Sequence, residues 1–172
     1  MFLTVLSLVY KNMNKSEVRQ AFLDELQRIH KTALNAAQTA IESATDEETV
    51  PEHKYDTLAL EAAYLAHGQA QRVAECEENI RLYSELVLRE FDEDTPIAVS
   101  ALLKLDDLNG NESWYFIAPT AGGTSVEFNG ESIASVTLQA PLGQQLKGKY
   151  LGDEIQLLAG NQQTNFEVVE LL

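Results

Sequence analysis

The chain has 172 residues, 45% of them hydrophobic, which is enough to bury a modest core and to carry an extended element besides. It holds 27 Asp and Glu against 12 Lys and Arg, so its net charge of −15 repels nucleic-acid phosphates. The composition therefore argues against direct nucleic-acid binding and favours a protein partner with a basic surface. A single cysteine, Cys76, excludes an internal disulfide and fits a cytoplasmic protein.

The first ten residues, MFLTVLSLVY, are apolar. They are too few to span a membrane, and they lack the basic start and the cleavage site of a signal peptide. Met13 begins a more ordinary N-terminus. We therefore expect residues 1–12 to be an upstream extension.

A long helix is predicted from Ser16, which we expect to be its N-cap. Its apolar residues recur at alternating spacings of four and three, which indicates a heptad stripe on one face. The stripe consists of Phe22, Leu26, Ile29, Ala33, Ala36 and Ala40.

A second helix is predicted after a polar turn that contains Pro51. Two stripes joined by a short turn bury each other best in an antiparallel hairpin over residues 13–90, roughly 40 Å long. The alternative is that both helices fold back onto the rest of the chain as a bundle. The second stripe consists of Leu58, Ala62, Leu65, Gln69, Val73, Cys76, Ile80, Tyr83 and Val87.

Composition changes at residues 91–96, an acidic stretch that ends in proline and that we interpret as a linker. The remainder, residues 97–172, has the composition of a β-rich domain, so the fold class is α+β. Turns are expected at Gly122-Gly123 and Asn129-Gly130, and a short helix at 141–147 with Pro141 in its first turn. Strands are expected at 97–105, 113–118, 133–138, 154–158 and 165–171.

The segment Ala140–Glu154, APLGQQLKGKYLGDE, resembles the signature of the Gre family of bacterial transcript cleavage factors, S-P-[LI]-[GA]-x-A-[LI]-x-G-K-x-x-G-D. The ending 166–171, FEVVEL, resembles the last strand of that family. Ala140 replaces the usual serine and Gln145 the usual alanine. Within the segment, Gly148 and Gly152 are expected at turns with positive φ, where a side chain would also clash.

This resemblance implies an FKBP-like antiparallel sheet domain that docks on the rim of the secondary channel of bacterial RNA polymerase. Lys147 and Lys149 would lie at the polymerase-facing end. The helical hairpin, a coiled coil, would enter the channel. The protein would be a cytoplasmic monomer and not itself an enzyme, with no cofactor of its own, no membrane contact and no sequence-specific nucleic-acid contact.

Four carboxylates, Asp46, Glu47, Glu48 and Glu52, lie between the two predicted helices. The resemblance implies that they assist transcript cleavage at the tip, where Asp46, Glu47 and Glu48 would transiently contact a Mg²⁺ ion supplied in the polymerase active site. The alternative is structural, since acidic residues also solvate a turn and stabilise the N-terminal end of a helix. The following Lys54-Tyr55-Asp56-Thr57 resembles the start of the second helix in divergent members.

Two other functions stay open from the sequence. One is a regulator that occupies the same channel without promoting cleavage. The other is a protein-interaction module unrelated to polymerase. A dedicated zinc site is not favoured, because His30, His53 and His67 share no ligand spacing.

Overall fold

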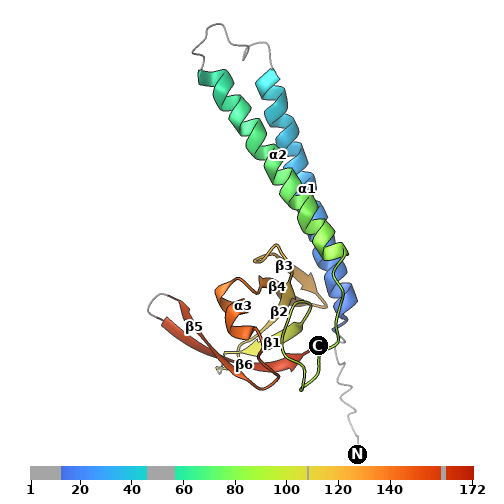
Figure 1. Ribbon diagram of the computed structural model, residues 1–172, viewed down its shortest axis with the longest axis vertical. Coiled ribbons are helices and arrows are strands. Elements are labelled where there is room, and N and C mark those ends of the chain that lie inside the picture. The colour runs from blue at the N-terminus through green and yellow to red at the C-terminus, as the bar shows by residue number, and fades with distance from the viewer. Residues whose placement is uncertain (1–12, 46–56, 108, 160–161) are drawn as a thin grey trace, which may run out of the picture.

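The computed structural model describes residues 13–45, 57–107, 109–159 and 162–172. Two long helices form an antiparallel hairpin that projects from a sheet domain (Figure 1), which confirms the predicted order of hairpin and then sheet. The elements are α1 (Lys15–Thr45), α2 (Thr57–Ser84), β1 (Leu102–Asp106), β2 (Glu112–Ala118), β3 (Ser125–Phe128), β4 (Glu131–Thr137), α3 (Pro141–Leu146), β5 (Glu154–Ala159) and β6 (Gln162–Leu171).

The N-cap of α1 is Asn14, so the prediction of Ser16 was wrong. The Asn14 side-chain oxygen accepts hydrogen bonds from the backbone N–H groups of Ser16 at 2.9 Å and Glu17 at 3.3 Å. Both residue types make good caps. Asn14 takes the role because its side chain reaches both of these otherwise unpaired donors, and the helix then begins at Lys15.

The buried stripe of α1 follows the prediction at Phe22, Leu26, Ala33 and Ala40. The observed stripe differs from the predicted one at the step after Ala33, where Ala37 is buried and the predicted Ala36 is exposed. A straight α-helix has 3.6 residues per turn, so the contact line drifts from a strict heptad.

In α2 the predicted stripe shifts by one residue as well. Leu65 is exposed, and the half-buried position belongs to Ala66. Alanines on both helices permit close approach of the two backbones. The last predicted position, Val87, is exposed and lies beyond the end of α2.

The six strands form one sheet in the order β3-β4-β2-β1-β6-β5. Neighbouring strands are antiparallel, as expected, except β2 and β4, which are parallel and make the sheet mixed. After β2 the chain crosses to the edge and runs back as β3. A tight turn with positive φ at Asn129 and Gly130 then returns β4 into the gap between β3 and β2.

The sheet is buried on both faces. One face carries Trp114 and Phe116 and packs on the base of the helical hairpin, where the Phe22 ring centroid lies 5.6 Å from that of Phe116. The opposite face carries Leu103 and Ile117 and packs under α3 through Leu146. The hairpin base and the sheet therefore share one continuous core, while the rest of the hairpin projects away from it.

The first strand of the sheet starts later than predicted. Residues 98–101 form a turn, in which Ala101 N–H donates to the Ala98 carbonyl and Ser100 has a φ of 79°. Strand β1 starts only at Leu102, because that positive φ bends the backbone out of an extended conformation, although Ser100 N–H already donates to the Ile117 carbonyl at 2.8 Å. Just before the turn, Phe91 of the predicted linker is buried, with the Lys15 ammonium 4.9 Å from its ring centroid.

Tyr83 is fully buried at the junction of α2 and the sheet, and burial raises its pKa to about 12, from the usual value of about 10. Below pH 10 both folded and unfolded states keep the neutral phenol. Above it the unfolded state ionises first, so the folded state loses stability as the pH rises from 10 to 12. We expect that loss to be about 2 to 3 kcal/mol and to be absent in Tyr83→Phe.

Chemical unfolding between pH 9 and 12 measures this difference, with Tyr150→Phe at an exposed tyrosine as the control. An identical pH dependence in Tyr83→Phe and in the wild type would contradict the assignment.

Candidate partner-binding site

The short helix α3 packs closely against the end of β4, because a glycine lies at the contact. A Cβ atom placed on Gly143 would lie 2.0 Å from the Thr137 carbonyl oxygen, so no other residue fits without a shift of the backbone. Pro141 starts the helix as predicted, and Leu146 anchors it in the core. The close contact of Gly143 with Thr137 and the burial of Leu146 thus fix the position of the signature segment.

The turns of the signature segment follow Gly148 and Gly152, whose φ values of 77° and 83° confirm the predicted left-handed conformation. The expected clash is wrong, because no atom lies within 4 Å of a Cβ built at either glycine. Glycine is favoured here by backbone conformation alone. Asp153 closes the second turn, since its side-chain oxygen accepts the Tyr150 N–H at 2.9 Å.

An apolar cleft of about 530 Å³ opens beside the start of α3. Its walls come from the glycine pair before β3, from β4, from the first residues of the signature segment and from β5. Small and aliphatic side chains predominate, so the cleft suits an apolar side chain of a partner. The lining residues are Gly122, Gly123, Ala134, Ser135, Val136, Thr137, Ala140, Pro141, Leu142 and Leu157.

Lys147 and Lys149 lie at the other end of α3 and do not line the apolar cleft. Lys147 is exposed and Lys149 is half-buried. Lys149 borders a separate, more polar cleft of about 320 Å³ together with Gln145 and Glu154. The structure therefore places an apolar cleft and the two lysines at opposite ends of the same short helix.

Only the two lysines were predicted from the sequence, and the apolar cleft was not. A local signal was present, because Ala140-Pro141-Leu142 puts three apolar residues at the start of a helix. The other walls come from segments that are distant in the sequence, and no pattern of spacing brings them together.

The predicted tip residues Asp46, Glu47, Glu48 and Glu52 lie outside the described residues. Their role as Mg²⁺ contacts thus stays a prediction. Within the described ranges, no three His, Cys, Asp or Glu side chains gather in a way that could hold a metal ion. The same ranges contain no helix with the length and apolar character of a membrane span.

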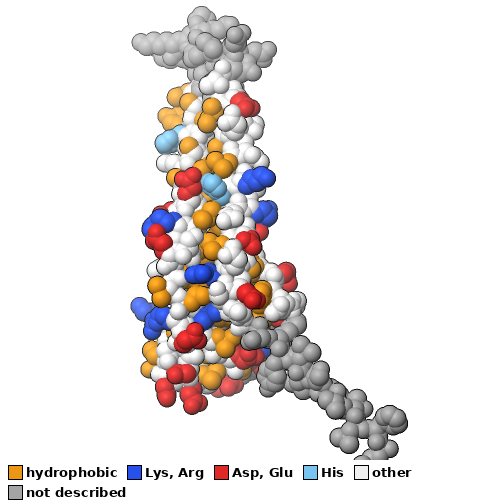
Figure 2. Space-filling view, turned by 90° about the vertical axis from the view of Figure 1, so that its right-hand side faces the viewer, with side chains coloured by type: hydrophobic (Ala, Val, Ile, Leu, Met, Phe, Trp, Pro, Cys, Tyr) orange, Lys and Arg blue, Asp and Glu red, His pale blue; other side chains and the backbone are white. Residues whose placement is uncertain are grey.

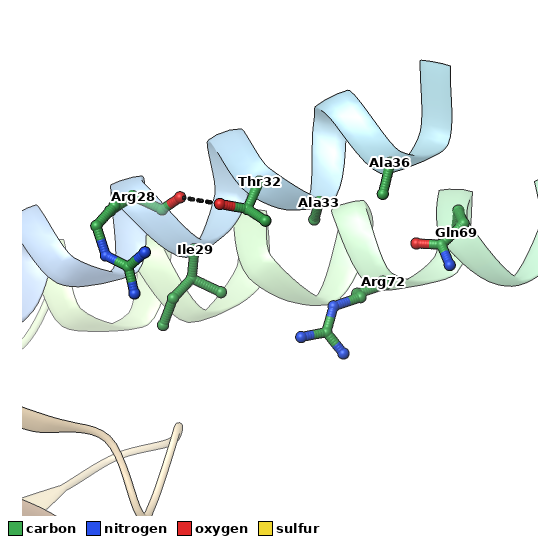
Figure 3. Close-up of a pocket in the computed structure, with 7 residues that line it drawn as sticks. All are labelled: Arg28, Ile29, Thr32, Ala33, Ala36, Gln69 and Arg72. Atoms are coloured by element: carbon green, nitrogen blue, oxygen red, sulfur yellow. Dashed lines mark hydrogen bonds between the residues drawn. The ribbon is translucent and has the colours of Figure 1, made fainter. Parts of the chain in front are cut away.

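A groove of about 240 Å³ runs along the helical hairpin (Figure 3). Its floor is formed by small residues such as Ala33 and Ala36, and Arg28 and Arg72 lie at its edge. Thr32 donates its hydroxyl back to the Arg28 carbonyl at 3.1 Å, and the Arg28 guanidinium pairs with Glu25 at 2.7 Å. The groove is shallow and the Arg28 guanidinium at its edge is already paired, so we assign it no ligand.

No protein-family model matches the chain, and no curated protein sequence matches it. Solved structures that are similar to it include the following three. The transcription factor Gfh1 is 18% identical, with a TM-score of 0.39 over 88% of this chain and 94% of that one. The GreA factor homolog 1 (Gfh1) protein of Thermus thermophilus is 20% identical, with a TM-score of 0.38 over 91% and 93%.

The third is the transcription elongation factor GreA/GreB from Nitrosomonas europaea, which is 16% identical, with a TM-score of 0.34 over 60% of this chain and 89% of that one. At these identities and TM-scores, function has to be argued from the site itself.

Proposed function

We propose that this protein is a transcription elongation factor that binds bacterial RNA polymerase, inserts its helical hairpin into the secondary channel and promotes cleavage of backtracked transcripts. The observation that carries the proposal is the joint presence of a projecting hairpin and a sheet domain built around the Gre-like signature segment. Each feature alone is common, whereas the family resemblance calls for both in this order.

The dimensions of the helical hairpin support this proposal. With 31 residues, α1 is about 46 Å long, and α2 with 28 residues is about 42 Å. Only the base of the hairpin packs on the sheet (Figure 1). A rod that buries so little of its length gains little stability from the sheet, which favours a role as a probe that reaches into a partner.

The chemistry would be performed by the polymerase. Carboxylates near its active site help to hold a second Mg²⁺ ion, and two such ions stabilise the attacking and leaving oxygens of phosphodiester hydrolysis. In this proposal Asp46, Glu47 and Glu48 supply those carboxylates, with Glu52 nearby. The protein acts on the polymerase and catalyses no reaction alone.

A second candidate is a regulator that occupies the channel without stimulating cleavage. It is favoured by the tip sequence, because typical Gre factors carry D-[LI]-x-E-N before the second helix, and this chain has Asp46-Glu47-Glu48 followed by Glu52. The two candidates share the binding mode and differ only in the effect of the tip on the transcript.

Docking of the sheet domain is tested at the two ends of α3. We expect Pro141→Glu, which places a charge at the mouth of the apolar cleft, to weaken the affinity for core polymerase about tenfold. Lys149→Glu should also weaken it, because it reverses a charge at the other end of α3. Equilibrium binding measures both, with Ser113→Glu at an exposed site on β2 as the control. Unchanged affinity in both α3 variants would remove this surface from the interface.

A further inference from the structure

Charged residues are distributed unevenly along the helical hairpin. Its distal half, residues 32–45 of α1 and 57–71 of α2, contains Glu42 and Glu61 as its charged residues. Figure 2 shows one face of the molecule, on which red and blue side chains are more numerous in the lower part of the hairpin. The proximal half, residues 15–31 and 72–84, contains Lys15, Glu17, Arg19, Asp24, Glu25, Arg28, Lys31, Arg72, Glu75, Glu77, Glu78 and Arg81.

The distal half also exposes large apolar side chains. Five of them have exposed fractions between 44% and 68%, and among the described side chains of the proximal half no large hydrophobic residue is exposed in this way. Scattered exposed apolar residues are ordinary on a soluble protein. It is not ordinary for them to be confined to the half of the hairpin that is poor in charge. They are Leu34, Ile41, Leu60, Tyr64 and Leu65.

Leu34 and Leu65 lie on two different sides of the distal half, each next to the seam between the helices. Leu34 follows buried Ala33 by one residue, which turns it about 100° away from α2. Leu65 precedes half-buried Ala66 by one residue on α2. Because the helices are antiparallel, a step forward on α1 and a step back on α2 lead to opposite flanks of the hairpin.

A third side is the outer surface of α2. Leu60 and Tyr64 precede the half-buried Ala62 and Ala66 by two residues each. Two residues correspond to about 200° of rotation, so both side chains point away from α1. The exposed apolar residues thus surround the distal half on three sides, and a flat partner or a single second copy would cover one of them.

We propose that an apolar, charge-poor surface inside the polymerase encloses the distal half of the hairpin on several sides. Leu34, Tyr64 and Leu65 each contact that surface. This inference rests on the proposed function and adds which residues hold the rod and what kind of surface faces them. An enclosing partner removes all three sides from water, which explains why the charges that solubilise the proximal half are missing here.

The test introduces one charge on each side, as Leu34→Glu, Tyr64→Glu and Leu65→Glu, with Gln27→Glu at an exposed site of the proximal half as the matched control. Circular dichroism checks that every variant keeps its helicity. Equilibrium binding to core polymerase should weaken about tenfold or more for each of the three variants and less than about twofold for the control.

Weakening in only one of the three variants would overturn enclosure in favour of a flat contact. A wild-type dimer in sedimentation that these variants dissociate would overturn it in favour of a second copy. Normal binding by all three variants would overturn this inference alone, whereas absence of wild-type binding would overturn the proposed function with it.

Discussion

Replacing Gly143 by alanine is expected to destabilise the protein by about 2 to 4 kcal/mol, the largest stability effect that the structure indicates for a single added methyl group. The new Cβ would lie 2.0 Å from the Thr137 carbonyl oxygen and 2.8 Å from its carbon, and both are backbone atoms that cannot turn away. Either α3 or the end of β4 has to move. That movement would open the contact that positions the apolar cleft.

Thermal and denaturant unfolding measure this effect, and Gly68→Ala is the matched control. Gly68 lies within α2, where no atom is within 4 Å of an added Cβ, so the same substitution should be neutral or stabilise by about 0.5 to 1 kcal/mol. If the free energy of unfolding of Gly143→Ala lay within 1 kcal/mol of the wild-type value, tight packing of α3 on β4 would be refuted.

The second large effect is expected at the tip of the helical hairpin. The triple variant Asp46→Asn, Glu47→Gln, Glu48→Gln should abolish stimulation of transcript cleavage in halted complexes and leave affinity for polymerase within about twofold. The reason is that amides keep the size of the side chains but are much weaker Mg²⁺ ligands than carboxylates. Glu52→Gln should matter less, because Pro51 separates it from the other three.

Cleavage is measured on a backtracked complex across a Mg²⁺ titration, with helicity as the folding control. A triple variant as active as the wild type would show that the tip does not act through these charges. If the wild type bound polymerase and never stimulated cleavage, the second candidate, a regulator that occupies the channel, would replace the first.

Much of the fold could be predicted because its signals are local. The apolar stripes predicted both long helices, Pro141 the start of α3, and Asn129-Gly130 the turn between β3 and β4. The parallel pairing of β2 with β4 could not be predicted. It depends on the short edge strand β3, and no local pattern states which strands become neighbours in a sheet.

The candidate site divides in the same way. The signature segment was found because its glycines and its aspartate fall at fixed spacings, and the structure explains those spacings through the turns at Gly148 and Gly152. The apolar cleft was missed because its walls meet only after the sheet has formed. The exposed residues of the distal hairpin were also missed, since a heptad pattern alone assigned Leu65 to the seam between the helices.

The cryo-electron-microscopy structure of a halted bacterial elongation complex with this protein bound would show directly whether the helical hairpin enters the secondary channel. The proposal predicts density for α1 and α2 inside the secondary channel, with the distal half enclosed and the sheet domain seated on the rim through the α3 end. A complex in which the helical hairpin lies on the outer surface, or the absence of any complex at saturating protein, would contradict it.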